Sequence, residues 1–399
     1  MKKIMLMAVV LCFSTGAWSQ GKNPGMGGDD ADIESLTERV LKLEKKADAF
    51  QVYFNYSAAF QESYERKEWG SAFRNRDARF EIKGNITPKL SYRFRHRLNK
   101  SNAAKGEDNF AKATDLLFVG YQFNEKIGVQ AGKVCQNFGG FEYDENPMFI
   151  YQYSDMLNYM DIFMAGVNLS YRPLATQELN LNVTNTYNGK FSEEYGDAPL
   201  TLANAGAVKE VEASKHPLTY IFLWNGSFLN DRLQTRWSWG IQTQARHKYS
   251  RLLMLGQRLN LPRLQFYMDY YAASDGLDCL RIASTEAADY LSASGAGYFS
   301  DVHYDALVAK ANWQFAPQWN LMLKGMYETA SVEKIEQFKN YRKAWGYLAS
   351  VEYYPVKRQN FRLFAAYIGR KYNYTSQCTL EDYDTHRVEL GFMYRIKAF

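Results

Sequence analysis

The sequence predicts an all-β protein, a transmembrane antiparallel β-barrel of about sixteen strands. Apolar and polar residues alternate at period two along many segments, as strands between lipid and a wet lumen require. Short turns and long stretches alternate between these segments. Aromatic residues make up 16% of the chain, and outer-membrane barrels place aromatic girdles at both membrane interfaces.

Residues 1–19 are predicted to be a secretory signal peptide. Lys2 and Lys3 form the charged start, residues 4–13 form a short apolar core, and Ala17 and Ser19 supply the small residues before the cleavage point. This apolar core is too short to be a stable membrane helix, and no later stretch has the ~18 apolar residues of a spanning helix. The signal therefore indicates export from the cytoplasm.

A Gly-rich spacer over residues 20–31 precedes a predicted short helix over residues 32–50. Its apolar positions follow the 3-4 spacing of a coiled-coil seam, with Ile33, Leu36, Val40 and Leu43 as the residues of a trimer helix. A helix this short is marginal alone, but attachment to an oligomeric barrel raises its effective concentration. The alternative is a lone amphipathic helix packed on the barrel mouth. Either way, we expect it on the periplasmic side.

Residues 51–399 are predicted to form the barrel. Leu179, Leu181 and Val183 alternate with polar residues, and Trp237, Trp239 and Ile241 do the same in residues 233–246. In the last strand Val388, Leu390 and Phe392 oppose Arg387, Glu389 and Arg395, and the sequence ends on Phe399, like the C-terminal signal of bacterial outer-membrane barrels. Phe399 shares the parity of Arg395, so we expect a bulge near Lys397 or a position beyond the ladder.

The spacing of turns predicts the strand number. Seven tight turns are expected near residues 87–88, 124–125, 173–174, 230–231, 261–262, 316–317 and 355–356. Between them lie long stretches at residues 62–71, 99–113, 136–161, 188–217, 272–302, 330–340 and 371–384. Seven turns, with the first strand closing on the last, imply about sixteen strands.

The lumen wall is predicted to be basic. The lumen-facing parity of residues 79–98 carries Arg79, Lys83, Arg93, Arg95 and Arg97, with Glu81 as the only acid. Three arginines at period two form a ladder with a spacing of ~6.6 Å. Guanidinium groups grip carboxylate or phosphate through two parallel hydrogen bonds. The plainer alternative is that a wide, wet barrel needs charged walls for solubility.

Residues 136–161 are predicted to be a constriction loop that folds into the barrel. The stretch holds no Lys or Arg and is rich in acids and aromatics; the residues expected at the constriction are Glu142, Asp144, Glu145, Asp155, Asp161, Tyr151 and Tyr153. Acids facing wall arginines would create a transverse field that selects solutes by charge. The alternative is an external loop whose acids only face water.

The signal peptide, the short helix, the strand number and two motifs resemble the phosphate-selective porin O and P family of Gram-negative bacteria. The motifs are Gly128-Val129-Gln130-Ala131-Gly132-Lys133 and Phe138-Gly139-Gly140-Phe141-Glu142. The resemblance covers most of the mature chain. It implies a trimeric sixteen-stranded barrel that carries a diffusion channel, with the third loop folded inward.

These observations predict a porin in the outer membrane of a Gram-negative bacterium. It would pass small hydrophilic solutes and lean to anions, phosphate-like or carboxylated. The alternatives are an oligosaccharide channel, whose aromatic loop would guide sugars, and a surface adhesin or scaffold anchored by the barrel. We expect no enzyme activity, because none of the five histidines lies near a serine in a recognisable pattern.

Few partners are expected. They are the lipid bilayer, a homotrimer, small anionic or sugar solutes and the barrel-assembly machinery, with no cofactor and no metal. A net charge of +5 is small for this length and argues against a nucleic-acid partner. Signal removal leaves Cys135, Cys279 and Cys378, an odd number, and whether Cys279 pairs with Cys378 stays open.

Overall fold

The computed structural model describes residues 49–398 except 105, 197–199, 205–206 and 357–358. The predictions for the signal peptide, the spacer, the trimer-helix residues Ile33, Leu36, Val40 and Leu43, and Phe399 lie outside these residues. Ala49 lies in a turn and Phe50 in no helix, so the helix predicted over 32–50 does not reach the start of the barrel.

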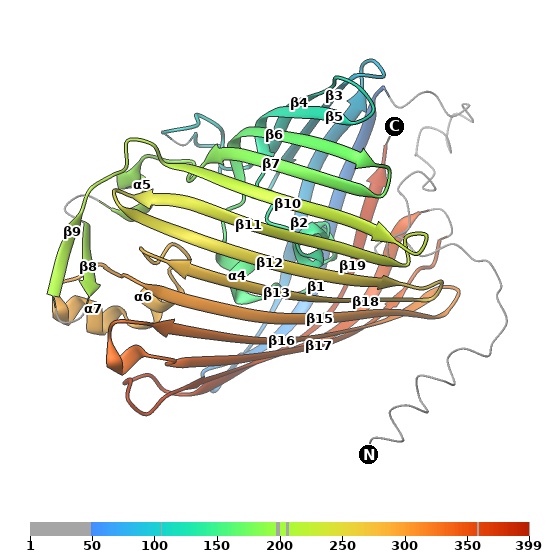
Figure 1. Cartoon of the computed structure of the whole chain (residues 1–399). Coiled ribbons are helices and arrows are strands. Elements are labelled where there is room, and N and C mark those ends of the chain that lie inside the picture. The colour runs from blue at the N-terminus through green and yellow to red at the C-terminus, as the bar shows by residue number, and fades with distance from the viewer. Residues whose placement is uncertain (1–48, 105, 197–199, 205–206, 357–358, 399) are drawn as a thin grey trace.

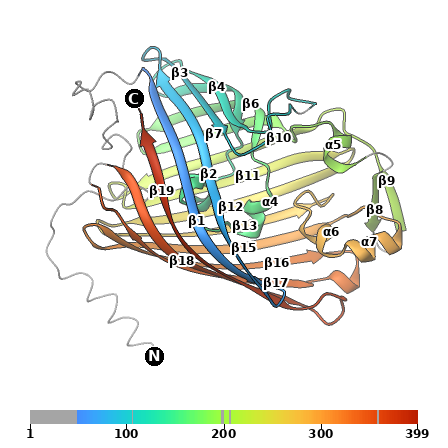
Figure 2. The same ribbon diagram turned by 180° about the vertical axis from the view of Figure 1, so that it is seen from behind.

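The described chain forms a closed antiparallel barrel of sixteen strands, which confirms the predicted fold class (Figure 1). The strands in chain order are β1 Gln51–Glu65, β2 Glu68–Asn85, β3 Leu90–Arg97, β4 Thr114–Gln122, β5 Ile127–Cys135, β6 Phe163–Leu174, β7 Gln177–Asn185, β10 Leu218–Phe228, β11 Leu233–Ala245, β12 Lys248–Asn260, β13 Leu264–Asp275, β15 Val302–Ala316, β16 Trp319–Val332, β17 Arg342–Tyr353, β18 Asn360–Tyr374 and β19 Tyr383–Lys397. The barrel closes where β1 pairs with β19 (Figure 2).

The two faces of the wall follow the predicted alternation. On β19, Val388 and Leu390 are 45% and 55% exposed on the outer face, whereas Glu389 and Arg395 are buried inside. On β11, Trp237 and Trp239 are exposed while Ser238 and Gln242 are buried. β19 pairs with β1 without a bulge through Lys397, so the odd parity of the basic residues is kept to the end of the ladder.

Seven short turns lie at one end of the barrel, and six of them overlap the positions that the sequence predicts. The seventh connects β6 to β7 at residues 175–176, two residues after the predicted position, because Pro173 and Leu174 still belong to β6. At the other end two residues also join β11 to β12, Arg246 and His247, a turn that the sequence did not predict.

At the opposite end the prediction for residues 62–71 is wrong. Strands β1 and β2 continue through this stretch and are joined only by Arg66 and Lys67. Both residues have left-handed backbone, with φ of 51° and 69°. Two-residue hairpin turns of type I′ need positive φ at both central residues. The sequence signal was missing because neither position is Gly, Asn or Asp.

The remaining elements lie in the long connections. A small sheet of β8 Leu200–Asn204, β9 Ala207–Val211 and β14 Tyr298–Phe299 projects beyond the barrel at the long-loop end. The short helices are α3 Phe141–Asp144, α4 Asp155–Tyr159, α5 Phe191–Tyr195, α6 Ile282–Glu286 and α7 Ala288–Ser294, and the 3₁₀ turns are η2 Pro147–Phe149 and η3 Glu336–Phe338. Among the described residues, no helix has the length and apolar character needed to cross a membrane. Cys135, Cys279 and Cys378 are free thiols.

Candidate functional site

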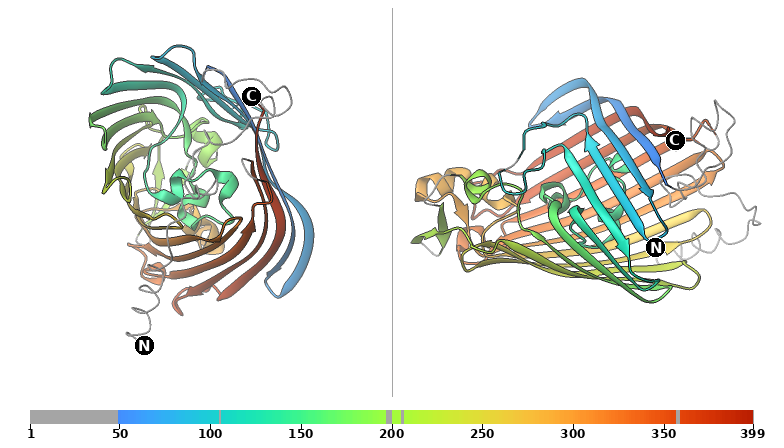
Figure 3. Two further views of the ribbon diagram at one scale, coloured as in Figure 1. Left: turned by 90° about the vertical axis from the view of Figure 1, so that its right-hand side faces the viewer. Right: turned by 90° about the horizontal axis from the view of Figure 1, so that it is seen from above.

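The segment between β5 and β6, residues 136–162, lies inside the barrel and carries α3, η2 and α4 (Figure 3). Gly139 and Gly140 have φ of 77° and 82°, a left-handed conformation that lets the chain turn sharply into the lumen. Phe138, Phe141 and Met156 are at most 2% exposed, because they pack in one cluster with side chains of β10, β12 and β13. The inward segment therefore fills the side of the lumen that these strands bound.

Acidic side chains tie the inward segment to this wall. Glu142 forms an ion pair with Lys324 (2.5 Å), and Glu145 forms one with Lys310 (2.6 Å). Asp155 lies between two arginines of the neighbouring strands, Arg342 and Arg370. The backbone N–H of Asp155 also donates to Glu328 (2.6 Å). These contacts reach β15, β16, β17 and β18. The segment is therefore attached to the barrel wall from Glu142 to Asp155.

This attachment corrects the expected partners of two acids. Glu142 and Asp155 are predicted from the sequence to face the arginine ladder, but they are 0% and 4% exposed and pair with cations on the other wall. The physical reason is burial, because a carboxylate removed from water needs a charged partner at contact distance. Glu142 and Asp155 are therefore anchors of the segment.

The arginine ladder lies on β2 and β3, across the lumen from those anchors. Asp115 on β4 accepts from three of its members: Arg79 (3.0 Å), Arg95 (3.2 Å) and Arg97 (2.8 Å). Arg93 instead pairs with Glu81 (2.8 Å). The side chains of Arg93 and Arg97 are 35% and 22% exposed, whereas those of Arg79 and Arg95 are nearly buried. Arg93 and Arg97 are thus the ladder members most open to a solute.

The ladder region has a surplus of positive charge, because its carboxylates are shared. Asp77 and Asp115 form ion pairs with Arg79, Arg95 and Arg97. Glu81 serves Arg93 and Arg395, and Glu389 serves Arg76 and Arg387. Each of these three groups contains one more cation than carboxylates.

A cavity of about 1360 Å³ separates the ladder from the inward segment. Most of the predicted site residues line it together: Arg79, Arg93, Arg95, Arg97, Asp144, Glu145, Asp161, Tyr151 and Tyr153. Lys83 is not part of this lining and lies over the ring of Tyr53, 5.0 Å from its centroid. Glu142 and Asp155 are also outside it.

The two sides of this cavity differ in charge. Strands β2 to β4, with the loop between β3 and β4, contribute seven basic and two acidic lining residues, namely Arg76, Arg79, Arg93, Arg95, Arg97, Lys100 and Lys112 against Asp77 and Asp115. The inward segment contributes Asp144, Glu145 and Asp161 and no base. Burial raises the pKa of Tyr143, Tyr151 and Tyr153 on this segment, so these phenols stay neutral at neutral pH.

Sequence reasoning missed Arg76 and Asp115. Both lie next to irregularities in strand pairing: the register of β1 and β2 shifts between Ser57 and Ala58, beside Arg76, and that of β3 and β4 shifts between Arg95 and His96. A one-residue shift changes which face a side chain occupies, so strict alternation misplaces such residues. The clustering of Arg93, Arg95 and Arg97 was the one available signal that a shared acid had to be near.

The closed barrel, its apolar outer wall and its water-accessible, charged lumen define an outer-membrane channel. The chain belongs to the phosphate-selective porin O and P family, which matches residues 50–396 and confirms the resemblance seen in the sequence motifs.

Solved outer-membrane proteins share the fold at low identity. The outer-membrane channel DcaP of Acinetobacter baumannii has a TM-score of 0.57 at 12% identity, covering 88% of this chain and 99% of its own. OmpF of Salmonella typhi, in complex with daunomycin, has a TM-score of 0.55 at 12% identity, covering 87% and 97%. In-vitro folded OmpT of Vibrio cholerae has a TM-score of 0.54 at 11% identity, covering 88% and 98%. The comparison with curated proteins found no match.

Proposed function

We propose that this porin passes small hydrophilic solutes with a preference for anions, either phosphate-like or carboxylated. The observation that carries the proposal is the seven-to-two excess of basic over acidic side chains on the β2–β4 side of the cavity. A wall of one dominant sign raises the local concentration of ions of the opposite sign. Guanidinium groups keep their charge at any physiological pH and match the geometry of carboxylate and phosphate oxygens.

The acids of the inward segment support the same proposal. Asp144, Glu145 and Asp161 line the cavity opposite the basic wall, and Asp144 and Glu145 also pair with Arg236 and Lys310. Opposite signs on facing walls create a transverse field, which orients water and polar solutes as they pass. An anion would therefore travel along the β2–β4 wall, where Arg93 and Arg97 are the most exposed ladder residues.

The packing of the aromatic residues favours this proposal over an oligosaccharide channel. Phe138, Phe141 and Tyr151 are buried, and the Tyr151 hydroxyl donates to Glu352 (2.8 Å). Rings packed in this way hold the segment and offer no continuous face for stacking sugar rings. Six tyrosines line the cavity, but Tyr151, Tyr187 and Tyr195 are at most 7% exposed, so few ring faces are open to a passing sugar.

Reversal potentials across a planar bilayer in a salt gradient test the ion preference. We expect the sign that corresponds to anion preference, and the preference should weaken at high salt because screening shortens the reach of wall charges. A reversal potential of the opposite sign would refute the anion proposal while leaving the channel itself intact.

We also propose a homotrimer, to which the seam of Ile33, Leu36, Val40 and Leu43 contributes as a periplasmic coiled coil. Support comes from the heptad spacing of these residues and from the trimer form of the structurally similar Vibrio cholerae OmpT. Deletion of residues 32–49 should lower the temperature at which trimers dissociate in a semi-native gel. If trimers of the deletion variant resist heat as well as the parent protein, the coiled coil does not hold them together.

A further inference from the structure

The Phe138-Gly139-Gly140-Phe141-Glu142 motif ends in a socket on the barrel wall. Asp269, on β13, is fully buried and accepts the backbone N–H of Phe141 at 3.0 Å and 2.9 Å through its two oxygens. It also accepts the N–H of Glu142 (2.7 Å) and the hydroxyl of Tyr271 (2.8 Å). One carboxylate therefore holds the first turn of α3 against the wall.

This anchor differs chemically from the others on the segment. In the described part of the chain, the hydrogen-bond partners of Asp269 are two peptide N–H groups and a phenol, all neutral. Glu142, Glu145 and Asp155 instead pair with lysine or arginine. The strength of a contact between a carboxylate and neutral donors depends less on ionic strength than the strength of an ion pair does.

Two glycines make the socket possible. A Cβ on Gly256 of β12 would lie 2.9 Å from the Cα of Gly140 and 2.6 Å from an oxygen of Asp269. A Cβ on Gly140 would lie 2.8 Å from the ring of Tyr271. The segment can approach Asp269 closely only because both side chains are absent. The Phe141 ring then packs under the guanidinium of Arg258, 4.5 Å from the ring centroid.

We infer that Asp269 is the positioning residue that sets the cross-section of the channel. It fixes the point where the inward segment, after leaving β5, meets the wall at β13. It thereby determines how far the rest of the segment extends across the lumen. The inference rests on the channel function and not on its proposed anion preference. Loss of the socket would let the start of the segment move away from β12 and β13 and change the width of the passage.

The variant Asp269→Asn tests this role with little change in shape. The amide presents a donor to the N–H groups of Phe141 and Glu142, so at least one contact becomes repulsive. Losing charge-assisted hydrogen bonds should raise the fraction of released segments by about 10- to 100-fold. We expect an additional, larger conductance level in single-channel recordings and faster entry of larger sugars in liposome swelling. The sign of the ion preference should stay the same.

A charge-neutral variant and a matched control complete the design. Gly256→Ala disturbs the same socket without changing a charge, and it should give the same larger conductance level. Asp305→Asn, on β15, removes one acid whose partners His303 and Tyr270 lie outside the cavity, and it should behave like the parent channel.

Three outcomes overturn the inference. The first is that both socket variants insert as channels with the parent conductance and sugar cut-off. The second is that the control changes conductance as much as they do. The third is that neither socket variant gives a heat-modifiable folded barrel, since the socket would then maintain the wall and not the segment.

Discussion

Replacing Arg93, Arg95 and Arg97 together by glutamine should shift the ion preference of the channel toward cations. The change reduces the basic residues on the β2–β4 side of the cavity from seven to four against the same two acids. It also leaves Asp115 with Arg79 alone and Glu81 with Arg395 alone. The wall would lose most of its positive surplus in the part of the cavity that the ladder lines.

Coulomb's law gives the size of the effect. A unit charge ~10 Å from a passing ion contributes on the order of 0.4 kcal/mol when water fills the space between them. Three such charges sum to ~1 kcal/mol, with opposite sign for anions and cations. This is roughly a fivefold change in the permeability of each ion, and about 25-fold in the ratio of anion to cation permeability. The shift should be largest at low salt, because the Debye length falls to ~10 Å at 0.1 M.

Reversal potentials measure this shift, and the outer wall offers a matched control. Arg251, Lys343 and Lys371 are exposed and do not line the cavity. Their triple glutamine variant has the same net charge as the ladder variant. The ladder has no role in selectivity if the two triple variants show equal reversal potentials.

The wall of the barrel could be predicted because the alternation of apolar and polar residues within each strand indicates which side chains face lipid and which face the lumen. Period-two alternation places Glu389 and Arg395 inside and Leu390 outside, and the structure keeps this pattern except beside register shifts such as those at Arg76 and Asp115. The clustered ladder was visible for the same reason, since Arg93, Arg95 and Arg97 share one face of one strand.

The arrangement inside the lumen could not be predicted from local pattern. Glu142 meets Lys324, and Asp155 meets Arg342, across sequence separations of more than 180 residues. Only the path of the inward segment decides which acids become anchors and which face the cavity. The acids of residues 136–161 are equivalent in the sequence, and burial in the fold is what separates Asp155 from Asp161.

Asp155 is expected to be the most sensitive position on the inward segment. It lies between Arg342 and Arg370, and these arginines also pair with Glu286 (2.8 Å) and Glu328 (2.9 Å). Asp155→Ala removes one of three acids from a buried group that contains two cations. Arg342 and Arg370 keep Glu286 and Glu328, so no cation is left unpaired. The loss is that of the hydrogen bonds that Asp155 accepts, about 1.5–3 kcal/mol for each bond to a charged group.

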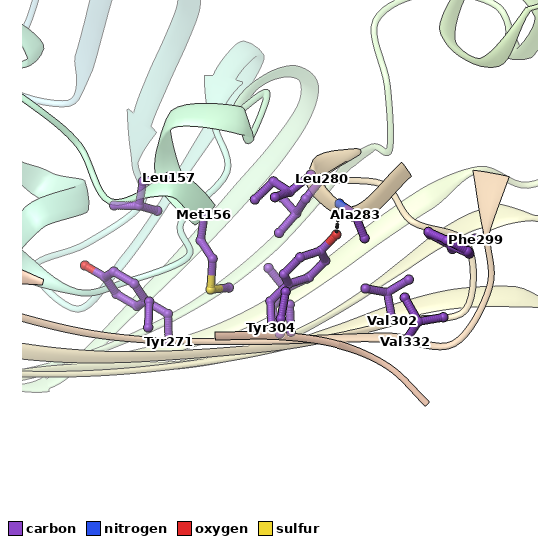
Figure 4. Packing of buried hydrophobic residues seen from close by; sticks show 14 of the residues in the cluster. Met156, Leu157, Tyr271, Leu280, Ala283, Phe299, Val302, Tyr304 and Val332 are labelled. Atoms are coloured by element: carbon purple, nitrogen blue, oxygen red, sulfur yellow. Dashed lines mark hydrogen bonds between the residues drawn. The ribbon is translucent and has the colours of Figure 1, made fainter. Parts of the chain in front are cut away.

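The lost stability concerns the attachment of α4 to the barrel wall. The backbone hydrogen bonds between the strands are not affected. Next to Asp155, Met156 and Leu157 pack in the cluster that contains Leu280, Tyr304 and Val302 (Figure 4). In that cluster the Tyr304 hydroxyl accepts the N–H of Ala283, which ties the loop between β13 and β15 to β15 itself. Loss of the Asp155 anchor should therefore loosen α4 from both the wall and this loop, while β15 to β18 keep their backbone pairing.

The expected result is a noisy channel in a barrel that still folds. Asp155→Ala should show frequent transitions between conductance levels in single-channel recordings, and its barrel should remain heat-modifiable in gels. Asp161→Asn is the matched control, because this acid lies on the same segment and is exposed, and its hydrogen-bond partner in the described part of the chain is Asn188 (3.0 Å). Quiet, single-level currents from Asp155→Ala would mean that the apolar contacts of Met156 and Leu157 hold α4 without the ion pairs. The two variants thus separate charge at the cavity surface from charge that holds the segment in place.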